Sequence, residues 1–284
     1  MKTVLVTGAS GQLGKCLQKI AENEHDIDWL FMDSSEIDIT STCDLSMCFG
    51  SKQIDYCINC AAYTNVEKAE SEREKAFSIN AEGVKNLAEI CKAHKTVLIH
   101  ISTDYVFDGS SNSPYKEDVA TNPINVYGAS KLKGEQYLQK IIGYHFIFRT
   151  SWLYSEFGHN FYKTILNKAT ENATLNITSA QKGAPTNANH LAELLVKIIK
   201  EENNRYGLYH FSNAGETTWY GFAKEILKVS GNYDNVVLNE DNTYKTIAAR
   251  PEYSVLDKTK LKYSFEVEVA SWQDAVLELY NKNL

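Results

Sequence analysis

The chain opens with a short strand, a glycine-rich turn and a helix, and this succession constrains the fold more than any other feature. Residues 3–7 form an apolar, β-branched run, and residues 12–23 carry apolar side chains at helical spacing. The turn between them has three glycines in a G-x-x-G-x-x-G pattern: Gly8, Gly11 and Gly14. Glycines permit a tight turn and let backbone N–H groups approach a pyrophosphate, which the helix N-terminus stabilises. The segment therefore predicts a dinucleotide-binding turn.

Strand-like and helix-like segments alternate through the first half of the chain. We expect strands at residues 3–7, 27–32, 55–60, 96–102 and 145–150, and helices at residues 12–23, 70–94 and 127–141. Continuous apolar strands that alternate with helices are typical of right-handed βαβ crossovers in a parallel sheet covered on both faces. Residues 1–150 are therefore predicted to form an α/β, Rossmann-like, doubly wound dinucleotide-binding domain.

The alternation of strand-like and helix-like segments is less regular after residue 150. Helices are expected at residues 160–170, 189–200, 219–229 and 272–283, and short strands at residues 175–178 and 208–212. We interpret residues 151–284 mainly as a smaller C-terminal α/β lobe that binds substrate. The sequence does not fix the boundary between this lobe and the first domain, because some segments of the lobe could return to the main sheet.

Composition excludes several classes of protein. With 43% hydrophobic and 23% charged residues in 284, the chain can build a core, which rules out a disordered or fibrous protein. A membrane span needs roughly 18 consecutive apolar residues, and neither such a run nor a secretory h-region is found. The formal net charge of −7 does not favour a nucleic-acid partner, which needs a basic face.

All six cysteines lie within the first 91 residues. Cys57 and Cys60 have C-x-x-C spacing, but no second pair follows, and a zinc site needs about four ligands. We interpret them as buried thiols and predict no metal site. A reduced, cytoplasmic setting fits this cysteine usage.

An acidic residue at the end of the second strand points to the cofactor. Asp33 lies 19 residues after Gly14, where a carboxylate accepts hydrogen bonds from adenosine ribose hydroxyls. Ser34 and Ser35 follow, without an adjacent Arg or Lys to pair a 2′-phosphate, although they do not exclude one sterically. The cofactor is therefore predicted to be NADH or NADPH, with NADH favoured.

Tyr127 and Lys131 form the most specific chemical signal. In a helix, residues four apart lie one turn above each other, so the ammonium is near the phenol. Lowering a phenol from a pKa of about 10 to about 7 takes roughly 4 kcal/mol of selective phenolate stabilisation, which a nearby cation in a dry site can supply. Thr103 directly follows the fourth strand, where ligands bind in open α/β sheets. These three residues predict a proton donor, its tuning cation and a hydroxyl that holds a carbonyl oxygen.

The glycine turn and the Tyr-x-x-x-Lys pair resemble those of extended short-chain dehydrogenase/reductases. Five further blocks are similar to one branch, the dTDP-4-dehydrorhamnose reductases: residues 61–70 (AAYTNVEKAE), 102–109 (STDYVFDG), 125–128 (NVYG), 149–152 (RTSW) and 183–186 (GAPT). The resemblance extends from residue 3 to about residue 260. It implies reduction of the 4-keto group of dTDP-4-dehydro-6-deoxy-L-mannose to dTDP-L-rhamnose, with hydride from a nicotinamide and a proton from Tyr127.

The resemblance also assigns expected roles to individual positions. The cofactor is expected to contact the following residues, together with Tyr127 and Lys131: Gly8, Gly11, Gln12, Leu13, Gly14, Asp33, Asp38, Ile39, Ala61, Ala62, Tyr63 and Thr64. The sugar is expected to contact Thr103, Asp104 and Trp152. Arg250 and Arg149 are candidates for the substrate diphosphate, because guanidinium suits phosphate oxygens. Salt bridges are an equal alternative for both arginines.

Some positions depart from the family pattern. Ala180-Gln181 replaces the usual Asp-Gln pair. Some members join subunits through magnesium held by glutamates at the positions of Cys16 and Asn189, and neither residue here supplies a carboxylate. We therefore expect a monomer or a homodimer that no metal bridges.

Two other functions remain open from the sequence. Another nucleotide-sugar enzyme, an epimerase or 4,6-dehydratase, would share the fold; a dehydratase commonly has Asp-Glu after the threonine, whereas this chain has Asp104-Tyr105. A non-catalytic dinucleotide-binding subunit, like the regulatory β subunit of methionine adenosyltransferase, is the second alternative. The complete set of Thr103, Tyr127 and Lys131 favours an enzyme.

Overall fold

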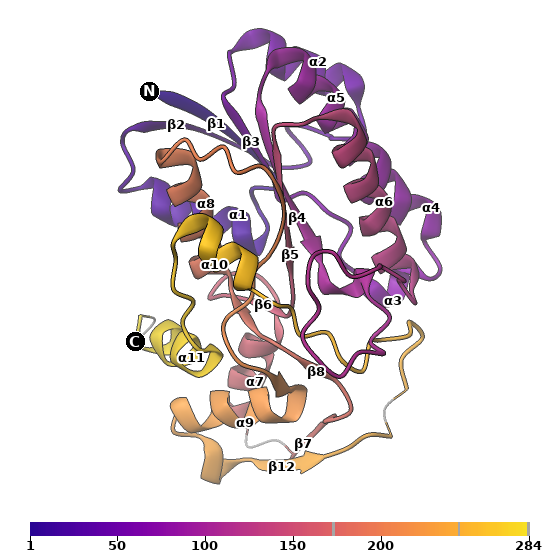
Figure 1. Cartoon of the computed structure of the whole chain (residues 1–284). Coiled ribbons are helices and arrows are strands. Elements are labelled where there is room, and N and C mark those ends of the chain that lie inside the picture. Colours follow the sequence, from indigo (N-terminus) through magenta and orange to yellow (C-terminus); the bar gives the residue numbers. More distant parts are fainter. Residues whose placement is uncertain (172–173, 244, 283–284) are drawn as a thin grey trace.

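Six parallel strands form the central sheet in the order β10-β5-β4-β3-β1-β2 (Figure 1). The strands are β1 (Lys2–Thr7), β2 (Ile27–Met32), β3 (Tyr56–Asn59), β4 (Val97–Thr103), β5 (His145–Thr150) and β10 (Gly207–His210). This computed structural model describes residues 1–171, 174–243 and 245–282. Each predicted strand of the first half lies within two residues of the observed one, and the Rossmann-like fold class is confirmed.

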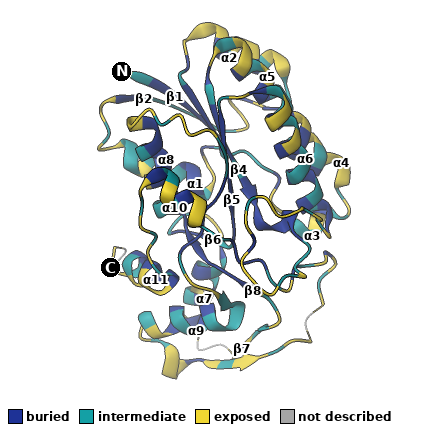
Figure 2. Cartoon of the chain, viewed as in Figure 1, coloured by how far each residue is buried: buried dark blue, intermediate teal, exposed yellow. Residues whose placement is uncertain are grey.

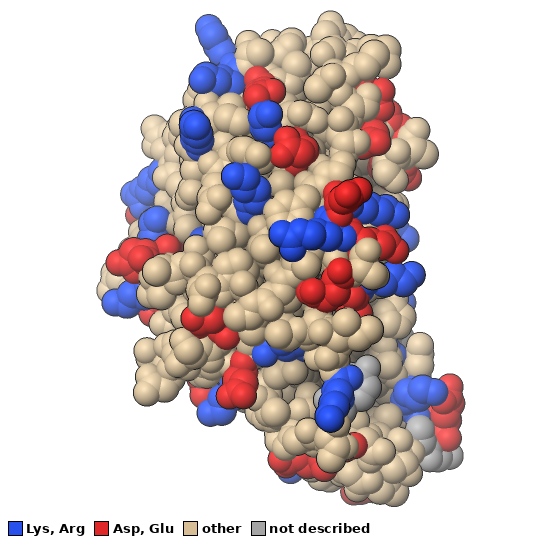
Figure 3. Space-filling model, turned by 90° about the vertical axis from the view of Figure 1, so that its right-hand side faces the viewer, with Lys and Arg blue, Asp and Glu red and all other residues tan. Residues whose placement is uncertain are grey.

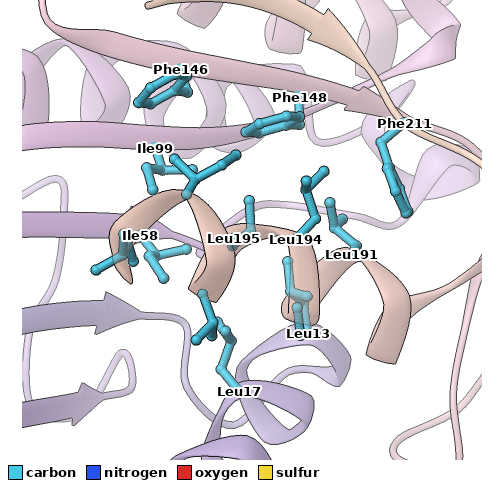
Figure 4. Packing of buried hydrophobic residues seen from close by; sticks show 14 of the residues in the cluster. Leu13, Leu17, Ile58, Ile99, Phe146, Phe148, Leu191, Leu194, Leu195 and Phe211 are labelled. Atoms are coloured by element: carbon cyan, nitrogen blue, oxygen red, sulfur yellow. The ribbon is translucent and has the colours of Figure 1, made fainter. Parts of the chain in front are cut away.

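Helices cover both faces of this sheet, as its continuous apolar strands require. One face packs against α1 (Gln12–Ala21) and α8 (Ala188–Lys200), and the other against α2 (Thr42–Ser51), α5 (Val84–His94) and α6 (Val126–Ile141). Figure 4 shows the first interface, where leucines of α1 and α8 meet aromatic and branched side chains of the sheet: Leu13, Leu17, Leu191, Leu194, Leu195, Ile58, Ile99, Phe146 and Phe148. The four inner strands β1, β3, β4 and β5 are buried along most of their length, whereas edge strand β2 is mostly half-buried (Figure 2).

Three elements from beyond residue 150 belong to this main layer. Strand β10 pairs with β5 at the edge of the sheet, and α8 packs on α1. Helix α10 (Thr259–Phe265) buries Leu261 and Phe265 in the same core. The remaining segments form a smaller lobe around α7 (Phe161–Thr170), α9 (Trp219–Val229), α11 (Trp272–Asn281) and the parallel pair β7 (Thr174–Ile177) and β12 (Val237–Glu240). Its shorter elements are β6 (Leu153–Tyr154), β8 (Lys182–Gly183), β9 (Thr186–Asn187) and β11 (Thr217–Thr218). The last residues of the predicted helix 272–283 lie partly outside the described residues.

The single helix predicted at residues 70–94 is wrong. The chain instead forms α3 (Val66–Ala69), α4 (Arg73–Phe77), a π-helical turn (Ser78–Gly83) and then α5. Asn80 in the π turn is fully buried and exchanges two hydrogen bonds with the backbone of Tyr63, at 2.8 and 3.0 Å, and one with Ser130 of α6. These long-range bonds give the irregular turn partners that a regular helix would not offer. Helical periodicity alone carries no such signal.

None of the helices within residues 1–171, 174–243 and 245–282 is both long and apolar enough to cross a bilayer. Lysine and arginine side chains are interspersed with aspartate and glutamate over the face drawn in Figure 3.

Candidate active site

A cavity of about 770 Å³ opens at the carboxyl ends of the parallel strands. Strand order reverses between β1 and β3, which are neighbours in the sheet, and crevices at such switch points are the usual ligand sites of open α/β sheets. The cavity extends from the turn after β1 to the end of β5, and the smaller lobe contributes Trp219 at the start of α9.

At the glycine turn, backbone without side chains lines one end of this cavity. Gly8 has φ +66°, and a Cβ there would lie 2.6 Å from the backbone nitrogen of Ala61, after β3. A Cβ on Gly14 would lie 2.5 Å from the carbonyl oxygen of Ala9. Gly11 is the N-cap of α1, with no side-chain cap and no acidic residue in the first turn. An uncapped helix N-terminus of this kind fits the pyrophosphate of a dinucleotide.

Most of the residues expected to contact the cofactor line the cavity. They are Gly8, Gly11, Gln12, Leu13, Asp38, Ile39, Ala61, Ala62, Thr64, Tyr127 and Lys131. Gly14, Asp33 and Tyr63 do not line the cavity. Gly14 lies where α1 packs closely against the turn at Ala9, and the backbone N–H of Tyr63 donates to the Asn80 side chain. Asp33 ends β2 beside Ser34, which does line the cavity. Hydrogen bonds from Ser35 hold the pKa of the Asp33 carboxyl below its usual value, so it is a charged acceptor.

The structure brings Thr103, Tyr127 and Lys131 together on the cavity wall. Thr103 ends β4, while Tyr127 and Lys131 lie one turn apart at the start of α6. Two side chains fix the start of this helix. The Asn125 side chain accepts from the Gly128 amide at 2.7 Å, and the Glu70 carboxylate accepts from the Val126 amide at 2.9 Å. The predicted juxtaposition of phenol, ammonium and hydroxyl therefore exists in the fold.

The pKa of Tyr127 differs from the expectation. Burial raises the pKa of Tyr127 to about 12, and its hydrogen bond with Thr103 only partly opposes this effect. The Lys131 ammonium donates to the carbonyl oxygen of Ile101 at 2.6 Å instead of pairing with the phenol. The expected lowering of the Tyr127 pKa toward 7 is therefore wrong. A protonated phenol is nevertheless the form that a proton donor requires.

Burial also changes the two ionisable groups beside Tyr127. It lowers the pKa of Lys131 to about 8, although Glu135 and Cys60 favour the charged form. It raises the pKa of Asp104 to about 6, against hydrogen bonds from Ser254 and Thr103. Groups shifted toward neutral pH in a cleft are typical of sites that move protons.

Two stacked indoles close the far end of the cavity. Trp152 and Trp219 have ring centroids 3.7 Å apart and nearly parallel planes, and both line the cavity. Trp152 adopts φ +48°, and a Cβ on Gly183 would lie 2.6 Å from its ring, so the ring occupies a space that only glycine leaves open. Sequence reasoning missed Trp219, because it belongs to a segment with no motif and meets Trp152 only through the tertiary fold.

The two arginines considered for the diphosphate are placed differently from that expectation. Arg149 is buried and makes a bidentate ion pair with Glu135 of α6, with contacts of 2.7 to 3.2 Å. It is not part of the cavity lining, and of the two alternatives that the sequence left open for Arg149 the structure shows the salt bridge. Arg250 is half-buried, bonds Glu67 of α3 at 2.8 Å and is also outside the lining.

The cysteines and the two positions considered above for a magnesium bridge, Cys16 and Asn189, have ordinary structural surroundings. Cys57 is buried, burial raises the pKa of the Cys60 thiol, and all six cysteines are free. Cys16 is buried in α1, and the Asn189 amide donates to Glu156 at 2.9 Å. In the described part of the chain, no three His, Cys, Asp or Glu side chains are grouped to hold a metal ion.

Gly128 offers a direct test of how α6 is positioned. A Cβ there would lie 2.1 Å from the carbonyl oxygen of Tyr105, so Gly128→Ala must push α6 away from the segment after β4. We expect a loss of about 1–3 kcal/mol in the free energy of unfolding, measured by urea denaturation. Gly143→Ala is the matched control, because nothing lies within 4 Å of its added Cβ. Equal stability of the two variants would contradict the close packing described.

These features define the class of the protein: an NAD(P)H-dependent oxidoreductase of the extended short-chain dehydrogenase/reductase type. The family model described as RmlD substrate binding domain matches residues 1–284. The chain is 39% identical to the dTDP-4-dehydrorhamnose reductase of Aggregatibacter actinomycetemcomitans, over 97% of each, and 37% identical to that of Escherichia coli K12, over 98% of this chain and 97% of the relative. The crystal structure of the Bacillus anthracis dTDP-4-dehydrorhamnose reductase with NADP superposes with a TM-score of 0.94 at 36% identity, covering 99% of this chain and all of that one. The chain belongs to the dTDP-4-dehydrorhamnose reductase family.

Proposed function

We propose that this protein reduces the 4-keto group of dTDP-4-dehydro-6-deoxy-L-mannose and so forms dTDP-L-rhamnose. The observation that carries the proposal is the convergence of Thr103, Tyr127 and Lys131 on one cavity whose other end is the glycine turn. Membership of the family supplies the substrate class. A cytoplasmic setting accords with six free cysteines.

The chain's own residues have distinct tasks in this reaction. A bound nicotinamide supplies the hydride. Thr103 and Tyr127 hydrogen-bond the 4-keto oxygen, and Tyr127 gives that oxygen its proton as the alcohol forms. Lys131 stabilises the phenolate that remains, and Trp152 packs against the sugar. The burial of Tyr127 keeps its phenol protonated and ready to donate.

The residues at the glycine turn hold the cofactor in this proposal. Backbone groups from Gly8 to Leu13 bind the pyrophosphate, and Asp33 with Ser34 faces the adenosine ribose. Asp33 favours NADH, whereas the Bacillus anthracis relative was crystallised with NADP. We therefore propose that either nicotinamide is accepted and that the two serines after Asp33 set the preference.

The test of this function is whether NADH or NADPH is oxidised only when the dTDP-4-keto sugar is present. An epimerase or 4,6-dehydratase would regenerate its cofactor internally and retain it through purification. A non-catalytic subunit would bind the cofactor and oxidise none. Purified protein that is largely free of cofactor, with oxidation strictly dependent on the ketosugar, supports the reductase. Turnover of dTDP-glucose without added cofactor would refute it.

Trp219 is expected to support sugar binding through its stack on Trp152. Trp219→Ala removes one face of that stack and should raise KM for the sugar nucleotide by about three- to tenfold, the range of one aromatic pair. Trp219→Phe keeps a flat ring and should recover most of the affinity. Initial rates at varied substrate concentration measure both. An unchanged KM in Trp219→Ala would show that the stack does not contribute to binding.

We expect a monomer or a homodimer that needs no metal. Cys16 is buried and Asn189 is an amide bonded to Glu156, so neither position offers a carboxylate to a magnesium ion. Addition of EDTA should leave the sedimentation behaviour and the reductase rate unchanged. A loss of dimer or of activity, restored by magnesium, would contradict this expectation.

A further inference from the structure

A row of polar side chains crosses three strands next to Lys131. Thr7 of β1 is in register with Asn59 of β3, which is in register with His100 of β4. The preceding row on the same face is apolar and packs under α5 and α6: Leu5, Cys57 and Leu98. All members of the polar row are fully buried, and the reaction steps described above use none of them. A buried polar row of this kind must be satisfied internally, which makes its proton positions specific.

The orientation of the Asn59 amide follows from its neighbours. The backbone N–H of Ala61 can only donate, so the side-chain oxygen of Asn59 must face it, at 3.1 Å. The Thr7 hydroxyl donates to that same oxygen at 2.7 Å. The Asn59 NH₂ group therefore points the other way, toward Nδ1 of His100 at 3.1 Å.

This orientation selects one form of His100. Because Asn59 donates to Nδ1, that nitrogen carries no proton, and the neutral ring must carry it on Nε2. The pKa of His100 is held well below its usual value, mainly by burial and further by the charges of Lys131 and of His145 on β5. The ring therefore stays neutral. Its Nε2 lies 3.5 Å from Nζ of Lys131, which places an N–H bond in front of an ammonium group.

We propose that His100 is a positioning residue: held as the Nε2–H form by Asn59 and Thr7, it directs Lys131 toward the carbonyl oxygen of Ile101 and disfavours its ammonium form. Two donors cannot bond each other, so the ammonium donates to the carbonyl oxygen of Ile101 instead, at 2.6 Å. The amine form, in contrast, has a lone pair that can accept from Nε2.

The other groups that face Lys131 act in the opposite direction. Glu135, on the same helix, and Cys60, after β3, both favour the ammonium, while burial disfavours it and the pKa of Lys131 is lowered to about 8. Tyr127, one turn earlier on α6, is protonated and uncharged at neutral pH. The polar row and burial thus act in the same direction: both lower the pKa of Lys131 toward neutral pH. The relevance of the polar row to catalysis rests on the proposed function, whereas its effect on Lys131 does not.

The experiment compares His100→Asn with His145→Asn. An asparagine oxygen at position 100 can still accept from Asn59, but no N–H reaches Lys131. His145 is also buried, on the adjacent strand, and contacts only the carbonyl oxygen of Ile142 among the hydrogen bonds described, so it is the matched control. NMR of isotope-labelled lysine follows the proton of Lys131 against pH without any substrate. We expect its midpoint to rise by about half to one pH unit in His100→Asn, the equivalent of one ordinary hydrogen bond, and to stay unchanged in His145→Asn.

A second measurement needs no variant to fold. NMR of nitrogen-labelled histidine in the unaltered protein should show His100 protonated on Nε2 alone, from about pH 6 to about pH 9. A proton on Nδ1, a charged ring in this range, or a Lys131 midpoint that does not rise in His100→Asn would overturn the proposal. If the Lys131 midpoint moves as expected while the ketosugar is not reduced, the proposed function fails and this inference stands.

Discussion

Tyr127→Phe should retain cofactor binding and lose turnover by about two to four orders of magnitude. The phenylalanine ring keeps the edge-to-face contact with Tyr105, whose centroid lies 5.9 Å away, so the cavity wall is preserved. Only the hydroxyl that we propose as the proton donor to the 4-keto oxygen is removed. Initial rates of NADPH oxidation with the ketosugar give the loss, and fluorescence titration with NADPH gives the affinity.

Tyr144→Phe is the control for this variant. The Tyr144 hydroxyl donates to the carbonyl oxygen of Lys92 at 2.9 Å, and the residue does not line the cavity, so its loss should leave the rate unchanged. Near-normal turnover in Tyr127→Phe would remove Tyr127 from the reaction. A rate loss caused only by weaker NADPH binding would assign it to the cofactor instead.

Glu135→Leu is expected to cost about 3–5 kcal/mol of the free energy of unfolding, because it leaves Arg149 buried without its counter-ion. The pair joins α6 to β5, and Ser102 of β4 also donates to Glu135. The ion pair of Arg149 with Glu135 therefore joins α6 to the sheet. Urea denaturation followed by circular dichroism measures the change.

An exposed pair with the same contact distance gives the comparison. Lys168 and Glu171 also approach to 2.7 Å, but both are about half exposed, so Glu171→Ala should cost less than about 1 kcal/mol. The double variant Glu135→Leu, Arg149→Met should recover much of the loss, since no unpaired charge remains buried. If Glu135→Leu costs no more than Glu171→Ala, the pair does not hold α6 in place.

The parts of the fold that depend on local pattern could be predicted from the sequence. The centre of strand β5, Phe146–Phe148, is apolar and covered on both faces, and the observed bounds of the strand, His145–Thr150, are those predicted. Tyr127 and Lys131 are separated by one helical turn, so their proximity follows from helix geometry alone. In contrast, α2 is only weakly amphipathic, so hydrophobic periodicity does not predict it, although its N-cap, Ser41, is a typical residue at a helix start.

The features that could not be predicted arise where separate elements meet. Arg149 lies within strand β5, and nothing in its surroundings in the sequence reveals that Glu135 on another element neutralises it. His100 lies within a run that reads as a buried strand, and its role depends on the register of β1, β3 and β4. The raised pKa of Tyr127 likewise depends on how deeply the fold buries it.

The most direct measurement mixes the purified protein with NADPH and dTDP-4-dehydro-6-deoxy-L-mannose and compares cofactor consumed with sugar product formed. We predict equal amounts of oxidised cofactor and of dTDP-L-rhamnose, with neither formed when Tyr127 is replaced by Phe. Ketosugar that stays unchanged, or that isomerises while NADPH remains reduced, would contradict the proposed reaction.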